Sequence, residues 1–169
     1  MRNMNRYVVF TVLLAVLFFG CKKDKGASDR MEGFVHFKLN GQEMKHDAHV
    51  SGNDPPSEEI VHFVTISGSG EPGPNDQPPV LDFQLVHDEV REGMEYTSAN
   101  SELHANYSSA TFAGGAEFTS TRDGGFFELR VTELGYYGVK GTFSGRLLSD
   151  ADQVINITDG TFEAPYNYR

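Results

Sequence analysis

Apolar and polar residues alternate along most of the chain from Phe34 onward, and this period of two limits the possible folds more than any other feature. It is clearest over 127–132 (FELRVT) and 139–147 (VKGTFSGRL), and it recurs over 34–39 and 81–85. Side chains of a β-strand point alternately to its two faces, whereas a helix needs a period of 3.6 residues. The pattern therefore predicts half-buried strands with one apolar face turned towards a core.

Turn signals divide this pattern into about nine or ten short strands. Asn40-Gly41 is the strongest short hairpin signal in the chain, and it predicts 42–46 as the return strand. Asp159-Gly160 predicts a later turn inside 155–164. Further strands are expected at 60–66, 103–107 and 116–120.

Two segments rich in Gly, Pro, Asn and Asp, 51–57 and 67–79, are predicted to be loops. The best helical candidate, 88–96, is short and contains Gly93. The prediction is therefore an all-β fold, an antiparallel β-sandwich or flattened barrel, with a single domain over 33–169.

The N-terminal segment has the pattern of an export signal. Arg2 and Arg6 precede an apolar run of fourteen residues over 7–20. As a helix, fourteen residues reach about 21 Å, which is short of the ~30 Å hydrocarbon core of a bilayer. This length is typical of the apolar region of a signal peptide. Gly20 and then Cys21, which is the only cysteine, end the run before a Lys-rich stretch.

The Gly20-Cys21 junction resembles a bacterial lipobox, including the bulky-residue variants of Bacteroidetes-type lipoproteins. The resemblance implies cleavage before Cys21, a diacylglycerol or acyl lipid on that cysteine and no other cofactor. Residues 1–20 are then the signal peptide and 21–32 a lipidated flexible tether. The implied partner is a lipid bilayer of the cell envelope, and Lys22 is more compatible with the outer membrane; the periplasmic and surface faces stay open. A plain secretory signal and an uncleaved anchor helix are the alternatives.

Near the C-terminus, G-x-F-x-G over 141–145 and I-x-I-T-x-G-x-F over 155–162 resemble the close of small, uncharacterised Bacteroidetes-type lipoproteins. There the first pattern is a strand and the second a final hairpin. The resemblance implies a β-sandwich lipoprotein without known activity, and it supplies no catalytic residues.

Composition and motifs exclude several classes of function. The net charge of −10 argues against binding nucleic acid, and a single cysteine excludes an intrachain disulfide. No nucleophile elbow or phosphate loop is present. His46 and His49 flank Asp47, and Asp150 lies near Asp152; solvated histidines and an acidic turn are favoured over metal sites.

Exposed tyrosines are the best candidates for binding a ligand. Tyr136 and Tyr137 are expected at a hairpin tip, and Tyr166 and Tyr168 on one face near the C-terminus. Aromatic rings stack on the apolar faces of sugars, and tyrosine keeps a polar handle. We therefore expect a lipid-anchored, non-catalytic binding or structural domain with an unidentified envelope partner. The alternatives are a glycan- or small-ligand-binding lipoprotein that uses these tyrosines and loops, and a hydrolase with an unrecognised pair of acids.

Replacing Cys21 with Ala should abolish anchoring, because each buried CH₂ of an acyl chain contributes about 0.8 kcal/mol to membrane affinity. Fractionation of cells at high salt tests this. The variant is expected in the soluble fraction or as unprocessed precursor, and its persistence with membranes as a processed protein would contradict the lipid anchor.

Overall fold

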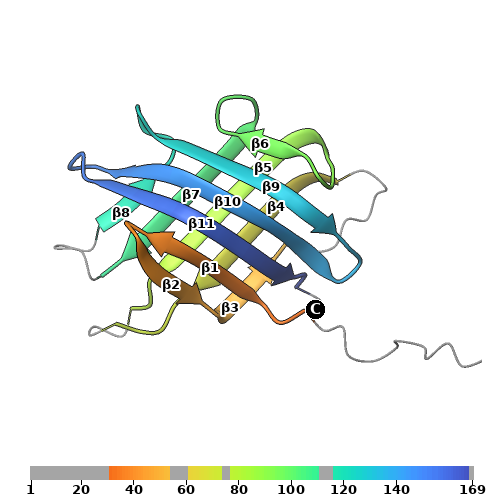
Figure 1. Ribbon diagram of the computed structural model, residues 1–169, viewed down its shortest axis with the longest axis horizontal. Coiled ribbons are helices and arrows are strands. Elements are labelled where there is room, and N and C mark those ends of the chain that lie inside the picture. Colours follow the sequence, from red (N-terminus) through yellow and green to blue (C-terminus); the bar gives the residue numbers. More distant parts are fainter. Residues whose placement is uncertain (1–30, 54–60, 74–76, 111–115, 168–169) are drawn as a thin grey trace, which may run out of the picture.

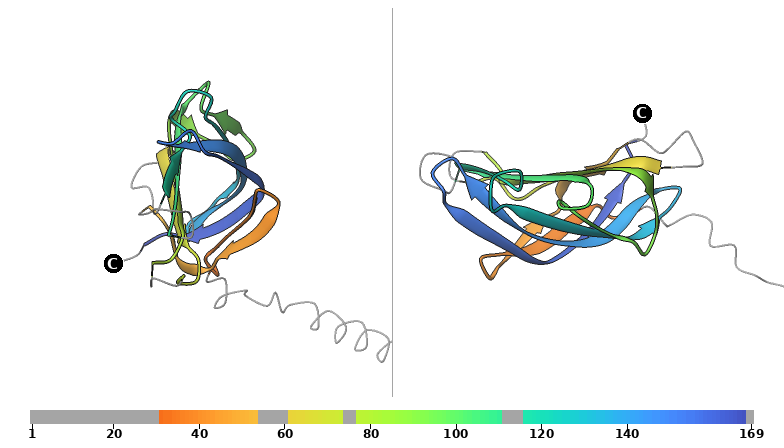
Figure 2. Two further views of the ribbon diagram at one scale, coloured as in Figure 1. Left: turned by 90° about the vertical axis from the view of Figure 1, so that its left-hand side faces the viewer. Right: turned by 90° about the horizontal axis from the view of Figure 1, so that it is seen from above.

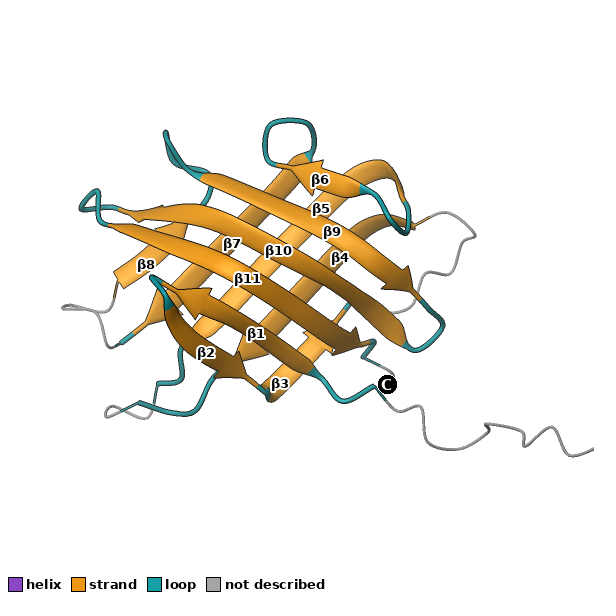
Figure 3. Ribbon diagram, viewed as in Figure 1, coloured by secondary structure: helices purple, strands orange, loops and turns teal. Residues whose placement is uncertain are grey.

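The computed structural model describes residues 31–53, 61–73, 77–110 and 116–167. Every regular element in those ranges is a β-strand (Figure 3), and none of them holds a helix suited to crossing a bilayer. The strands are β1 (Phe34–Leu39), β2 (Gln42–His46), β3 (Ala48–Gly52), β4 (Val61–Ser69), β5 (Val80–Val90), β6 (Glu95–Thr97), β7 (Glu102–Ser109), β8 (Ala116–Thr119), β9 (Phe126–Leu134), β10 (Gly138–Ser149) and β11 (Val154–Pro165).

The strands form one antiparallel sheet that folds over into two layers (Figures 1 and 2). The front layer of Figure 1 runs β2-β1-β11-β10-β9-β6 and the back layer β8-β7-β5-β4-β3. Strand β10 joins the layers, because it pairs with β9 over most of its length and with β8 at Leu148 and Ser149. The predicted all-β, sandwich-like fold is confirmed, with eleven strands in the described ranges.

A cluster of phenylalanines lies between the layers. The ring of Phe143 on β10 packs against three rings from its own layer and against Phe83 of β5, whose centroid is 5.1 Å away. The three are Phe37, Phe127 and Phe162. All five side chains are at most 4% exposed. The alternation predicted for β9 and β10 is therefore confirmed, since its apolar positions face this core.

The first hairpin follows its sequence signal. Asn40 and Gly41 have φ angles of 50° and 85°, the left-handed values that a tight two-residue turn between antiparallel strands requires. Leu39 then pairs with Gln42 and Val35 with His46, so β2 has the bounds that the sequence predicted.

The turn predicted at Asp159-Gly160 is wrong, and so is the final hairpin implied by the family resemblance. β11 is one strand that continues through both residues, and its register against β10 shifts between the Phe143–Gly160 and Gly145–Ile157 pairs. Asp159 has a φ of 53°, which identifies a β-bulge. An Asp-Gly pair supplies left-handed backbone equally well to a bulge and to a turn, so its sequence cannot separate them.

Two other local predictions, the loops at 51–57 and 67–79, need correction. Ser51 and Gly52 belong to β3, and 67–69 forms the end of β4, so the described non-strand parts of the two predicted loops are Asn53, 70–73 and 77–79. The segment 88–96, which is only a weak helical candidate by sequence, contains the end of β5 and the start of β6, in agreement with the all-β prediction. In both loops, pairing with neighbouring strands outweighs weak local propensity.

Phe143→Ala should lower the free energy of unfolding by about 3–5 kcal/mol, because it leaves a cavity among rings from both layers. Phe126→Ala on the neighbouring strand is the matched control, since Phe126 is 38% exposed and should cost less than about 1 kcal/mol. Urea denaturation measures both values. Equal losses in the two variants would contradict the role given to this cluster.

Candidate functional site

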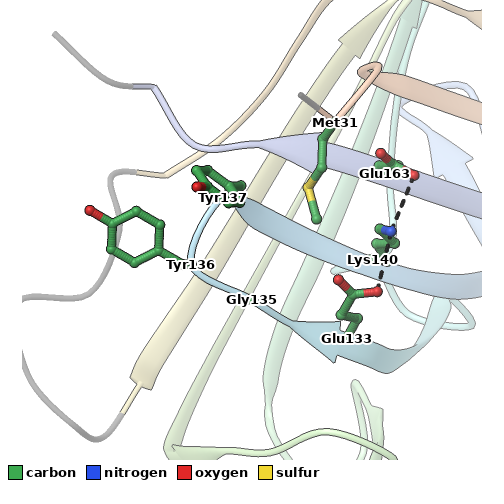
Figure 4. Close-up of a pocket in the computed structure, with 7 residues that line it drawn as sticks. All are labelled: Met31, Glu133, Gly135, Tyr136, Tyr137, Lys140 and Glu163. Atoms are coloured by element: carbon green, nitrogen blue, oxygen red, sulfur yellow. Dashed lines mark ion pairs between the residues drawn. The ribbon is translucent and has the colours of Figure 1, made fainter. Parts of the chain in front are cut away.

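Two tyrosines predicted at a hairpin tip lie there and are exposed. Tyr136 and Tyr137 form the turn between β9 and β10, with 76% and 55% of their surface accessible. Their rings stand at 90° to one another with centroids 5.1 Å apart, so they do not form one flat surface. Figure 4 shows Tyr137 and Met31, the first described residue, beside the same pocket.

The pocket beside this turn is small and its charges are paired. Its volume is about 140 Å³. The ammonium group of Lys140 lies 3.2 Å from Glu133 and 3.6 Å from Glu163. The hydrogen bond that Lys140 donates to Glu133 is the main cause that raises the pKa of Lys140. Because Lys140 already forms ion pairs with two carboxylates, its charge is not free to bind an anionic ligand.

The second predicted tyrosine pair does not form an exposed platform. Tyr166 is only 5% exposed and belongs to the core. Its N–H donates to the Tyr137 carbonyl oxygen, and it bridges to Gly52 of β3, so the chain after β11 is held against both layers. Tyr168, Gly20 and Cys21 lie outside the described residues.

His46 is not the solvated histidine that the sequence favoured. It pairs with Val35 and points inwards, with 0% of its surface exposed. Its Nδ1 lies 3.1 Å from the Gly68 carbonyl oxygen; a carbonyl only accepts, so Nδ1 carries the proton. Nε2 has no hydrogen-bond partner within the described part of the chain. The ring stacks on Tyr107 at 6.2 Å, and burial is the main cause that lowers the pKa of His46.

The structure does not bring the suggested metal ligands together. Asp47 pairs with His36, while His49 is exposed at a φ of 52°. Among the described residues, no group of three or more His, Cys, Asp or Glu side chains is arranged to hold a metal ion.

The aspartates near the end of β10 belong to an acidic turn, as predicted. Asp150 and Asp152 lie in the turn between β10 and β11. The backbone N–H groups of Ala151 and Gln153 donate to Ser149 Oγ. Asp150 also pairs with Arg122, so side-chain hydrogen bonding and an ion pair hold this turn.

A set of polar side chains that no sequence motif indicates covers the outer face of the back layer. Strand pairing aligns them in two rows across β4, β5, β7 and β8. One row holds Thr65, Gln84 and His104, and the other Ser67, Asp82, Asn106 and Thr119. We call these residues the polar face. Most of them, together with Thr121, line an open hollow of about 460 Å³.

The chemistry of the polar face suits a neutral, hydroxyl-rich ligand. Two amides, an imidazole and several hydroxyls offer donors and acceptors, and Asp82 is the one formally charged side chain in the two rows. One row further along, Phe63 lies opposite Val86 on the same face, and 50% of its surface is exposed. Because residues two apart on a strand are about 6.6 Å apart, an extended ligand would meet polar groups and then an aromatic ring.

Sequence reasoning missed this face for a clear reason. The alternation identifies Gln84 and Asn106 as outward-facing, but their adjacency depends on the register of β5 against β7. Nothing local in the sequence fixes that register.

Comparisons with known proteins add no assignment: a scan against protein-family models and searches of curated proteins and of solved structures found no match to this chain.

The stability of the domain should depend on pH through His46. Its pKa in the folded state lies below its ordinary value of 6.5, so the unfolded chain binds the proton first as pH falls. The contribution of neutral His46 to the free energy of unfolding is therefore complete above about pH 6.5. Below that pH the free energy of unfolding falls by up to about 1.4 kcal/mol per pH unit.

Urea denaturation of the wild type and of His46→Phe between pH 7.5 and 5.5 measures this difference. The variant keeps an aromatic ring and loses the titration, so its stability should fall less steeply. Parallel curves for the two proteins would contradict the assignment.

Proposed function

We propose that this protein is a lipid-anchored component of the bacterial cell envelope whose β-domain binds glycans without catalysis. The observation that carries the glycan assignment is the polar face, where strand register gathers neutral hydrogen-bonding side chains beside an exposed phenylalanine. The anchor is inferred from the sequence around Cys21 and from the family resemblance, and Lys22 directly after that cysteine favours the outer membrane.

The polar face matches the surface of a sugar in two respects. Sugar hydroxyls both donate and accept hydrogen bonds, as do the amide, imidazole and hydroxyl groups of Gln84, His104 and Thr119. The apolar face of a sugar ring stacks on an aromatic ring, for which Phe63 is available. Polar contacts fix orientation and the aromatic contact contributes apolar burial, a division typical of ligand sites.

Two other hollows in the described ranges fit a neutral ligand less well. The hollow of about 410 Å³ on the outer face of the front layer is lined by Glu95, Glu128, Arg130 and Asp159 among others, so a neutral ligand there would displace water from several charges. The pocket beside Tyr137 is smaller, at about 140 Å³. The back layer therefore offers the better surface.

A glycan array of neutral oligosaccharides, probed with the detergent-solubilised full chain, tests the proposal, followed by titration calorimetry on the best ligand. Asn106→Ala and Gln84→Ala should each weaken binding by about 2- to 10-fold, since a net hydrogen bond contributes about 0.5–1.5 kcal/mol. Phe63→Ala should weaken it at least as much.

Asn156→Ala is the matched control, because Asn156 is an exposed residue of the same type on β11 of the front layer. It should bind as the wild type does. An array without binding, or equal losses in the Asn106 and Asn156 variants, would refute the glycan assignment. Cleavage products from a bound oligosaccharide would favour the hydrolase alternative.

A further inference from the structure

The described chain enters the domain beside the exposed tyrosine turn. Met31 lines the same pocket as Tyr136 and Tyr137, and its sulfur lies so close to Gly138 that a Cβ on that glycine would be only 2.4 Å from it. Figure 4 shows Met31 between the tyrosine turn and the Glu163–Lys140 pair. The tyrosines and the chain entry are therefore at one end of the molecule.

A third exposed apolar side chain flanks this end. Met94, with 50% of its surface accessible, follows the turn between β5 and β6. Two hydrogen bonds hold that turn against the end of β9: Gly93 N–H donates to the Val131 carbonyl oxygen, and Leu134 N–H donates to Glu92 Oε1. In Figure 1 the β5–β6 and β9–β10 turns both lie on the right. We call Met94, Tyr136 and Tyr137 the apolar rim.

The length of chain between the predicted lipid and the domain keeps this end near a bilayer. Nine residues lie between Cys21 and Met31, and the ten Cα–Cα steps that join the two extend over at most about 33–36 Å. As a flexible coil they would span about 16–19 Å. The turns at the other end of the strands, such as 150–153, lie a whole strand length further away.

We infer that the apolar rim rests on the interface of the bilayer to which Cys21 is anchored, so that the domain has a preferred orientation there. This inference depends on the lipid anchor of the proposed function. Tyrosine is favoured at membrane interfaces because its ring is apolar and its hydroxyl stays hydrated. Lys22, Lys23 and Lys25 would complement anionic headgroups.

The described charges near the rim are partly paired, and Glu92 in the β5–β6 turn adds one further carboxylate. Lys140 lies between Glu133 and Glu163, which reduces the negative charge facing the headgroups. The perpendicular arrangement of the two rings is a poor platform for one flat sugar ring but no hindrance to insertion among headgroups. In this orientation the polar face lies on the flank of the domain.

The absence of tryptophan from the chain allows a direct test. Tyr136→Trp places a single fluorophore in the rim, and Phe126→Trp places one at the start of β9, at the opposite end of the same strand. Phe126 is 38% exposed, so both replacements lie at the surface. Each lipidated full-length variant is reconstituted into phosphatidylethanolamine–phosphatidylglycerol vesicles with or without brominated acyl chains.

Brominated lipid should reduce the emission of Tyr136→Trp at least about twofold, as for an interfacial aromatic residue, and should leave Phe126→Trp unchanged. Equal quenching of the two variants, or none in either, would overturn the inference. Quenching of Tyr136→Trp by a soluble oligosaccharide instead of by bromolipid would also overturn it, in favour of a sugar platform at the turn.

Flotation of the same samples separates this inference from the anchor on which it depends. If both variants float with the vesicles but brominated lipid quenches neither, the anchor is supported and the oriented contact is refuted. Failure of both variants to float would refute the anchor, and the contact with it.

Discussion

Packing of phenylalanine rings between the two layers is the constraint on which the rest of the structure depends. Phe143 of the front layer and Phe83 of the back layer meet in this core. Because a strand places alternate side chains on opposite faces, fixing Phe83 inwards fixes Asp82 and Gln84 outwards on β5. The polar face is thus the reverse side of the core, and one register error would exchange the two sets of residues.

The sequence predicted those features that depend on local pattern. Alternation identified the buried side of β9 and β10, and Asn40-Gly41 identified the first hairpin with its bounds. The sequence did not predict features that depend on pairing between distant strands. Asp159-Gly160 is a bulge because β1 and β10 flank β11 on both sides. His46 is buried because Val35 opposite it faces the core, although its side chain is polar.

In the candidate sites, too, features set by local sequence were predicted, and features set by contacts between distant strands were not. The exposure of Tyr136 and Tyr137 followed from a Gly-flanked hairpin tip, whereas the burial of Tyr166 depends on contacts with the other layer. Gln84 and His104 become neighbours only through the β5–β7 register. The sequence can therefore predict the exposure of single residues at turns, but it cannot predict which residues of different strands lie side by side on a surface.

The proposed orientation, with one end of the domain towards a membrane and the polar face on its flank, depends on the chain being held at Cys21. Mass spectrometry of the native protein tests that central point most directly. The expected result is a mature N-terminus at Cys21 that carries the added mass of a diacylglycerol or acyl lipid. An unmodified thiol at that residue, or a polypeptide that begins upstream of it, would contradict a lipid anchor at Cys21.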